Sequence, residues 1–186
     1  VLRFFIQIFK NEFLEPTLTV LKTMKEDTLR SNTLNELTRI YLFELPDLEK
    51  GHANAVQQIA LAKKINFKKG LANGYLNKGI YYRTTGNYGM AHYFDNAALK
   101  IVQSIGNKKG ESSCYGNIGM TYINQGNYKL SLEYSFKGLK IKEEIDDKRG
   151  VAISYNNIGA VYYDQGNYTE ALNCYLKSLK LLHTTI

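Results

Sequence analysis

The chain has no tryptophan, only two prolines among its 186 residues, and no long hydrophobic run. Scarce proline leaves long stretches free to form helices, because proline breaks a helix interior. The most apolar stretch, residues 1–9, is interrupted by Gln7 and ended by Lys10. It is too short to cross a bilayer, and no small-residue cleavage site of a signal peptide follows it. We expect an amphipathic packing or partner-seeking helix there, with a trimmed signal peptide as the alternative and no membrane insertion of this segment.

Cysteine and histidine are also scarce, with two cysteines and three histidines. Cys114 and Cys174 belong to no CxxC motif, so we interpret them as small buried apolar residues rather than as a disulfide. The histidines are scattered, and no Ser/His/Asp set, carboxylate pair or phosphate-binding loop stands out. We therefore expect no catalytic residue, no metal and no cofactor, and the protein is not expected to be an enzyme.

The formal net charge of +7 is modest for the length. Basic pairs recur at residues 68–69, 108–109 and 148–149. Each pair stands where one expected helix ends and the next begins, which is a solvated corner. Nucleic-acid binding needs a basic stripe together with base-stacking or base-reading groups. We therefore expect a solvated edge and no nucleic-acid partner.

One feature is present with strict regularity. The triplet Gly-Asn-Tyr occurs at residues 86–88, 126–128 and 166–168, each forty residues after the last, and the motif Asn-x-Gly-x-x-Tyr recurs in the same register. Self-similarity at this spacing indicates a repeat array. We expect an N-terminal helical segment at 1–30 and an array over 31–186. Its repeats are expected at about 31–70, 71–110, 111–150 and 151–186, and the first is degenerate because it has Pro46-Asp47-Leu48 in place of the triplet.

The third repeat shows what each unit builds. Tyr115, Ile118, Gly119 and Tyr122 fall on one helix face, and Gly119 there favours close helix approach. Gly126 is expected to end the first helix in the left-handed conformation, and Asn127 to cap a second helix from Tyr128 to about Ile145. Such hairpins bury their apolar faces only by stacking. The sequence therefore predicts an all-α fold, a right-handed α-solenoid of stacked antiparallel helix hairpins.

The repeats resemble the tetratricopeptide repeat family. Its pattern of an aromatic residue, Leu-Gly and Tyr, then Ala and an aromatic residue, is represented here by Tyr155, Ile158-Gly159, Tyr162, Ala171 and Tyr175. The second repeat departs from it, with Asp95 in the second aromatic position. The forty-residue period resembles the kinesin-light-chain-like variety. Residues 21–28 and 34–37, with the Lys-Lys-Gly endings, look like the N-terminal repeat region of bacterial sensor histidine kinases and related signalling proteins.

The resemblance implies a non-catalytic scaffold that binds a protein or peptide in its concave groove, as the sensory or interaction module of a bacterial signalling protein. Asn77, Asn117 and Asn157 lie two residues before the packing glycines and are expected to point away from the packed face. First helices about 10 Å apart would bring one asparagine to every third residue of an extended peptide, which advances about 3.3 Å per residue. A carboxamide both donates and accepts, and related arrays use asparagine here for that purpose. The alternative is that each amide bonds a neighbouring helix.

The expected groove residues combine amide, apolar and cationic groups: Asn77, Asn117, Asn157, Arg83, Met120, Asn124, Asn156 and Tyr163. Arg83 would favour an acidic or C-terminal carboxylate end of the ligand. The alternative function is self-association of a larger signalling protein, as a homodimer. It rests on the leucines of the last hairpin, which no polar capping helix follows: Leu172, Leu176, Leu179, Leu181 and Leu182. Cysteine usage and the poor leader favour the cytoplasm, whereas the sensor-kinase resemblance favours the periplasm.

Overall fold

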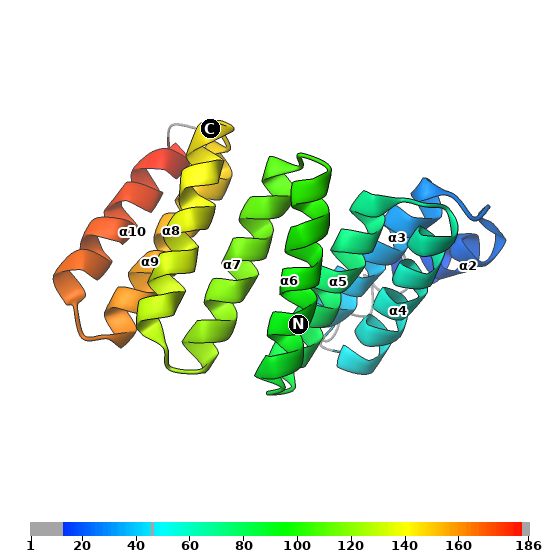
Figure 1. Ribbon diagram of the computed structural model, residues 1–186, viewed down its shortest axis with the longest axis horizontal. Coiled ribbons are helices and arrows are strands. Elements are labelled where there is room, and N and C mark those ends of the chain that lie inside the picture. Colours follow the sequence, from blue (N-terminus) through cyan, green and yellow to red (C-terminus); the bar gives the residue numbers. More distant parts are fainter. Residues whose placement is uncertain (1–12, 46, 184–186) are drawn as a thin grey trace. The chain divides into compact units, whose positions relative to one another are not determined.

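The computed structural model describes residues 13–45 and 47–183, and its secondary structure in these ranges is helical (Figure 1). Residues 1–9 and Pro46, on which two expectations rest, lie outside the described residues. The chain divides into two compact units, Val1–Tyr81 and Tyr82–Ile186, whose boundary falls inside one helix. The all-α fold of helix hairpins is confirmed, and each unit is described by itself.

Unit 1 contains α2 (Glu15–Thr23), α3 (Thr28–Arg39), a π-helical turn (Ile40–Glu44), α4 (Leu48–Lys64) and most of α5 (Lys68–Thr84). The helix α3 follows Asp27, whose side chain accepts the backbone N–H of Arg30 at 3.0 Å and so caps the helix. Leucines from α2, α3 and α4, with Tyr41, form the core of this unit.

Unit 2 contains the end of α5 and the helices α6 (Tyr88–Ser104), α7 (Lys108–Asn124), α8 (Tyr128–Glu144), α9 (Lys148–Asp164) and α10 (Tyr168–His183). Each helix from α6 to α9 has 17 residues. Each helix packs on the next along the chain, from α6 to α10 (Figure 1). Odd-numbered helices from α5 to α9 are the first helices of the hairpins, and even-numbered helices are the second.

The Gly-Asn-Tyr triplets form the turns inside the hairpins, as predicted. Gly86, Gly126 and Gly166 have φ angles of 80°, 70° and 75°, in the left-handed region that glycine adopts without strain. The side chain of Asn127 accepts the backbone N–H of Leu130 at 3.1 Å and so caps α8. The triplet therefore fixes the turn through backbone conformation and capping, and its glycine and asparagine serve local structure.

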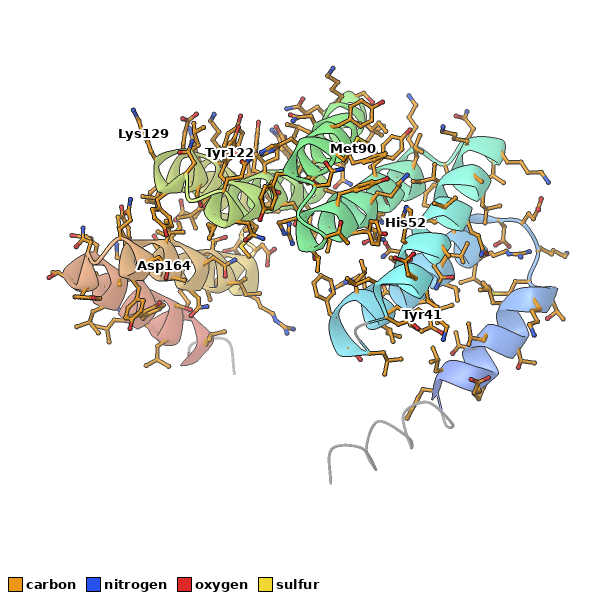
Figure 2. The ribbon with its side chains drawn as sticks, turned by 90° about the horizontal axis from the view of Figure 1, so that it is seen from below. Tyr41, His52, Met90, Tyr122, Lys129 and Asp164 are labelled. Carbon is orange, nitrogen blue, oxygen red and sulfur yellow. The ribbon has the colours of Figure 1, made fainter. Side chains whose placement is uncertain are left out.

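Close approach within a hairpin depends on the packing glycine, as expected. A Cβ placed on Gly119 of α7 would lie 3.0 Å from Oγ of Ser135 and 3.3 Å from the backbone oxygen of Ser131, both on α8. Nearby, the ring of Tyr122 stacks on that of Tyr134, with centroids 5.6 Å apart. Figure 2 marks Tyr122 on α7. Small residues at these positions let the two helices share one interface.

Successive hairpins are joined by an apolar cluster. Leu139 of α8 and Val151 and Ile158 of α9 are buried together with Cys174 of α10. Both cysteines are free and buried, as interpreted from the sequence. Burial raises the pKa of the Cys114 thiol to about 12, with Asp95 acting in the same direction. A thiol with so high a pKa stays protonated at neutral pH and is a poor nucleophile.

Candidate functional site

The first helices of unit 2 carry, beside their buried residues, a set of half-buried and exposed positions. We call it the first-helix face. On α9 its residues recur at helical spacing from Ile153 to Tyr163, and on α7 they run from Gly116 to Asn124. Its members are half-buried or exposed: Gly116, Asn117, Met120, Asn124, Ile153, Asn156, Asn157, Ala160 and Tyr163.

The three asparagines of the repeated motif differ in their surroundings. Asn157 on α9 is exposed and Asn117 on α7 is half-buried. Asn77, in unit 1, is only 4% exposed. Its Nδ2 donates to Oδ1 of Asn35 at 2.9 Å and to Oε1 of Gln58 at 3.4 Å. The amide of Asn77 therefore bonds neighbouring helices, which is the alternative that the sequence left open, and we do not include it in the first-helix face.

Other expected groove residues do lie on this face. Asn124 and Asn156 are exposed, and Met120 is half-buried on α7. The side chain of Tyr163 is 57% exposed. Its ring meets that of Tyr168 edge to face, with centroids 5.4 Å apart. The face thus offers amide groups beside a large aromatic surface, a combination suited to hydrogen bonding and apolar contact.

Arg83 has different surroundings from those expected. It lies at the end of α5 near Asp95 of α6, which is 0% exposed. Burial lowers the pKa of the Arg83 guanidinium and the charge of Asp95 raises it. Burial raises the pKa of Asp95 to about 7, and Arg83 and the Asn117 amide act in the opposite direction. Since Arg83 already faces a carboxylate of the same chain, we do not assign it to the acidic end of a ligand.

The sequence did not identify this pairing. Asp95 stood out only as a charged residue in an aromatic position, and Arg83 only as a cation near the expected groove. The only sequence signal for this pairing is that both charged residues occur in the same repeat. The two oxygens of Asp95 and Nη1 of Arg83 are buried and make no hydrogen bond of ordinary geometry within the described residues.

A second surface lies on α10. Tyr168, Leu172, Leu176, Leu179 and Leu182 are exposed at helical spacing, and we call this set the α10 stripe. Leu179 is 52% exposed, whereas Leu139 at the equivalent position of α8 is 5% exposed. The difference arises because α9 covers α8, and no helix among the described residues covers the stripe. Leu181, which the sequence grouped with these residues, instead packs against the apolar cluster of α8, α9 and α10.

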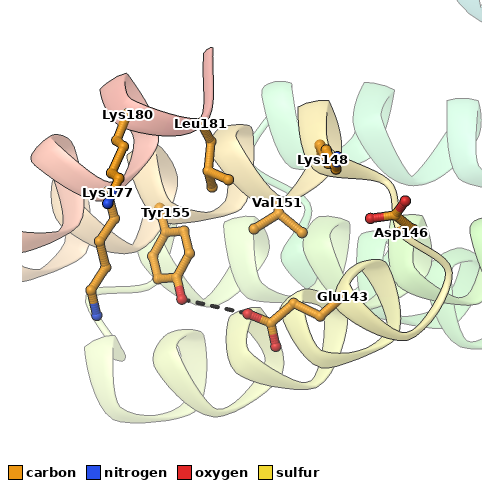
Figure 3. Close-up of a pocket in the computed structure, with 8 residues that line it drawn as sticks. All are labelled: Glu143, Asp146, Lys148, Val151, Tyr155, Lys177, Lys180 and Leu181. Atoms are coloured by element: carbon orange, nitrogen blue, oxygen red, sulfur yellow. Dashed lines mark hydrogen bonds between the residues drawn. The ribbon is translucent and has the colours of Figure 1, made fainter. Parts of the chain in front are cut away.

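A hollow of about 490 Å³ lies between the ends of α8, α9 and α10 (Figure 3). Val151, Tyr155 and Leu181 supply apolar surface, and the hydroxyl of Tyr155 points to Glu143, with oxygens 3.5 Å apart. Burial and Glu143 raise the pKa of Tyr155. The charged residues that line the hollow carry both signs: Lys148, Lys177, Lys180, Glu143 and Asp146. This mixture favours neither an anion nor a cation, and we assign the hollow no ligand.

The described ranges also bear on metal binding and membrane crossing. Within residues 13–45 and 47–183, no group of three or more His, Cys, Asp and Glu side chains is placed to hold a metal ion. None of the helices in those ranges combines the length and the apolarity that a membrane crossing needs.

The comparisons with known proteins agree with this architecture. Residues 110–182 match the family model of the tetratricopeptide repeat. A comparison with curated protein sequences gives no match. Among solved structures, the chain is similar to a Rap protein complexed with competence and sporulation factor, at 15% identity and a TM-score of 0.79. This match covers 87% of the chain and 45% of the Rap protein.

Two further structures share the arrangement. NprR in complex with its cognate peptide NprX is 22% identical, with a TM-score of 0.68, over 92% of the chain and 49% of NprR. A kinesin light chain with nearly identical TPR-like repeats from Podospora anserina is 12% identical, with a TM-score of 0.66, over 99% of the chain and 93% of that structure. At these identities the likeness shows the fold, and the chain spans less than half of the Rap protein and of NprR. Residues 110–182 therefore match the tetratricopeptide repeat family, and the fold of the chain is that of TPR-like repeat proteins.

Proposed function

We propose that unit 2 is a non-catalytic scaffold that binds a peptide or a partner's helix on its first-helix face. The observation that carries this proposal is the pair Asn117 and Asn157, which occupy equivalent positions of α7 and α9 and are half-buried and exposed, respectively. Asn156 and Asn124 add two exposed amides to the same face. Backbone recognition needs groups that both donate and accept, and the carboxamide is the side chain that provides both without charge.

An extended peptide suits this spacing. Neighbouring first helices of stacked hairpins lie about 10 Å apart, and an extended chain covers that distance in about three residues. One peptide unit bound by Asn117 and another bound by Asn157 would leave two side chains between them. Met120, Ile153 and Tyr163 supply the apolar surface that those side chains would meet. The proposed ligand therefore has polar backbone contacts at every third residue and at least one apolar side chain between them.

Two of the similar structures support a peptide ligand. NprR was solved with its cognate peptide and the Rap protein with competence and sporulation factor. The first-helix face of this chain would serve the same purpose, as the sensory or interaction module of a signalling protein. The sequence resemblance to the repeat regions of bacterial sensor kinases favours the same role.

A peptide array tests the proposal. Purified chain is applied to immobilised random heptapeptides with blocked ends, and the bound peptides are compared between wild type and Asn117→Ala/Asn157→Ala. We expect wild type to retain a defined subset and the double variant to lose most of it. Asn173→Ala removes an exposed asparagine from α10 and serves as the matched control. Unchanged binding by the double variant would show that the first-helix face does not bind these peptides through Asn117 and Asn157.

Self-association is the second candidate function, and the α10 stripe is the observation that favours it. Four exposed leucines and Tyr168 follow one side of the helix, whereas Leu139, the α8 equivalent of Leu179, is buried. A second copy covering the stripe would bury these side chains. Light scattering over a concentration series tests this: Leu172→Glu/Leu179→Glu should abolish a dimer that wild type forms. A wild type that stays monomeric at every concentration would exclude it.

A further inference from the structure

The end of the last hairpin at which residues 165–167 join α9 to α10 is negatively charged. Residues 150–176 contain no lysine, arginine or histidine, and Asp164 and Glu170 are their only charged residues. The cations of the two helices all lie toward the opposite end of the hairpin: Lys148, Arg149, Lys177 and Lys180. A ligand that meets the turn end therefore meets anionic groups without competing cations from α9 or α10.

Two exposed tyrosines lie at the same end. The side chains of Tyr163 and Tyr168 are 57% and 64% exposed, and their rings meet edge to face. Each ring is held against the other, yet more than half of each side chain stays in contact with solvent. The face of an aromatic ring carries partial negative charge and attracts a cation. The pair is therefore a surface on which a cationic group can rest.

Asp164 places a carboxylate beside this surface. It follows Tyr163 at the end of α9 and is exposed (Figure 2). None of the ion pairs within residues 13–45 and 47–183 involves Asp164, including any with Lys129 at the turn end of the preceding hairpin. An ion pair with a ligand would therefore not have to displace a partner within these residues.

The sequence of α9 also leaves room for a long side chain. Forty residues earlier, on α7, the positions of Ala160, Tyr163 and Asp164 hold a methionine, an isoleucine and an asparagine. Ala160 is small and exposed, and it lies along the helix between Asn157 and Tyr163. The rise of an α-helix separates Asn157 from Tyr163 by about 9 Å. A ligand residue whose backbone is held at Asn157 would lay an aliphatic stem over Ala160 and bring a charged end to Tyr163 and Asp164.

We propose that Tyr163, Asp164 and Tyr168 form a subsite for a cationic side chain of the peptide ligand, and we call it the cation subsite. Arginine is preferred over lysine, because a planar guanidinium stacks on an aromatic ring and donates two hydrogen bonds to one carboxylate. The subsite also orients the peptide, since the basic residue lies at the α9 end of the first-helix face and not at the α7 end. The proposal rests on the proposed function, because the first-helix face holds the peptide that carries the cation.

The heptapeptide array with blocked ends tests the composition of the ligand. Wild type is compared with Tyr163→Ile/Asp164→Asn, which installs the two residues that α7 carries at these positions. We expect peptides with arginine or lysine to be commoner among those that wild type retains than in the library, and the double variant to lose mainly these peptides. Tyr93→Ile removes a tyrosine of α6 that is 65% exposed and serves as the matched control. Retained peptides without this enrichment, or basic peptides that the double variant retains equally, would overturn the proposal.

A neutral analogue of arginine tests the role of the charge. Fluorescence anisotropy gives the Kd of the best arginine-containing heptapeptide and of the same peptide with citrulline in place of arginine. For wild type, citrulline should weaken binding roughly five- to tenfold, the combined effect of an exposed cation–π contact and a surface ion pair. For Tyr163→Ile/Asp164→Asn the two peptides should bind alike. Equal binding of both peptides by wild type, or undiminished discrimination by the double variant, would refute the cation subsite.

The cation subsite and the proposed backbone contacts can fail separately. If Asn117→Ala/Asn157→Ala loses the peptides while Tyr163→Ile/Asp164→Asn retains the basic ones, the backbone contacts stand and the cation subsite is wrong. If the asparagine variant retains basic peptides that Tyr163→Ile/Asp164→Asn loses, the cation subsite stands without those backbone contacts. A chain that retains no heptapeptide would overturn both.

Discussion

The buried pair Arg83 and Asp95 predicts an unusual dependence of stability on pH. The opposite charges of Arg83 and Asp95 act on each other, and removing one of them leaves the other charge without compensation in a buried place, which is costly. Arg83→Ile and Asp95→Ser should each be destabilising for this reason. The double variant installs the residues of the third repeat, Ile123 and Ser135, and leaves no buried charge. We therefore expect it to lose far less stability than the sum of the two single variants.

The sign of the pH dependence follows from the raised pKa of Asp95. Its pKa is about 7 in the folded protein and about 3.8 in an unfolded chain. Between these values the folded state holds a proton that the unfolded state has released, so the free energy of unfolding falls as the pH rises. At about 1.4 kcal/mol per unit, the loss between pH 5 and pH 7 is about 2 kcal/mol. Above about pH 7 both states are ionised and the dependence ends.

Urea unfolding followed by the helical circular dichroism signal measures this effect. Wild type and Arg83→Ile/Asp95→Ser are compared at pH 5, 6, 7 and 8. Burial lowers the pKa of His52 in both proteins, and a lowered histidine pKa adds stability as the pH rises. The difference between the two proteins cancels that contribution. Relative to the double variant, wild type should lose about 2 kcal/mol from pH 5 to 7. A difference that is constant across this range would refute a raised pKa at Asp95.

Further predictions concern packing, capping and the end of the described array. Gly119→Ala should lower the free energy of unfolding by about 1–3 kcal/mol because its Cβ would crowd α8. Gly116→Ala on the same helix meets open space and should raise it by up to about 1 kcal/mol, and equal effects would refute the packing argument. Asn127→Ala should cost about 1 kcal/mol through the lost cap of α8, measured by urea unfolding, and no loss would contradict that role. Leu139→Ala should lower the free energy of unfolding by about 2–5 kcal/mol because Leu139 is buried. Leu179→Ala should lower it by less than about 1 kcal/mol in a monomer, because Leu179 is exposed. Similar losses for the two variants would show that the α10 stripe is covered in solution.

The fold could be predicted because its signals are local and repeated. Each Gly-Asn-Tyr triplet holds its own turn by a left-handed glycine and a capping asparagine, so no long-range contact is needed to interpret it. Gly119 was identified in the same way, since glycine on a packed helix face lowers helix propensity and is favoured there by the close approach of a second helix. The forty-residue period then implied stacking. The repeat boundaries remain predictions.

The surroundings of individual side chains could not be predicted from the repeat alone. Asn77 shares its motif with Asn117 and Asn157, yet it is buried because Asn35 and Gln58 stand opposite it. Those partners belong to a repeat whose motif is degenerate, and nothing in the motif indicates them. The sequence analysis assigned Arg83 to a ligand and did not foresee its neighbour Asp95. The two residues belong to different helices of the hairpin, at positions that no periodic pattern links. A repeat therefore specifies which face a residue occupies, whereas its partners decide whether the residue is available.

The central claim is that Asn117 and Asn157 hold a ligand's backbone on the first-helix face, and an affinity measurement tests it most directly. The best heptapeptide from the array is labelled with fluorescein, and its Kd is measured by fluorescence anisotropy at pH 8. Two lost hydrogen bonds at about 0.5–1.5 kcal/mol each predict that Asn117→Ala/Asn157→Ala weakens binding roughly tenfold or more. Asn173→Ala should bind like wild type. A double variant whose Kd equals that of wild type, with its helical signal intact, would contradict the account.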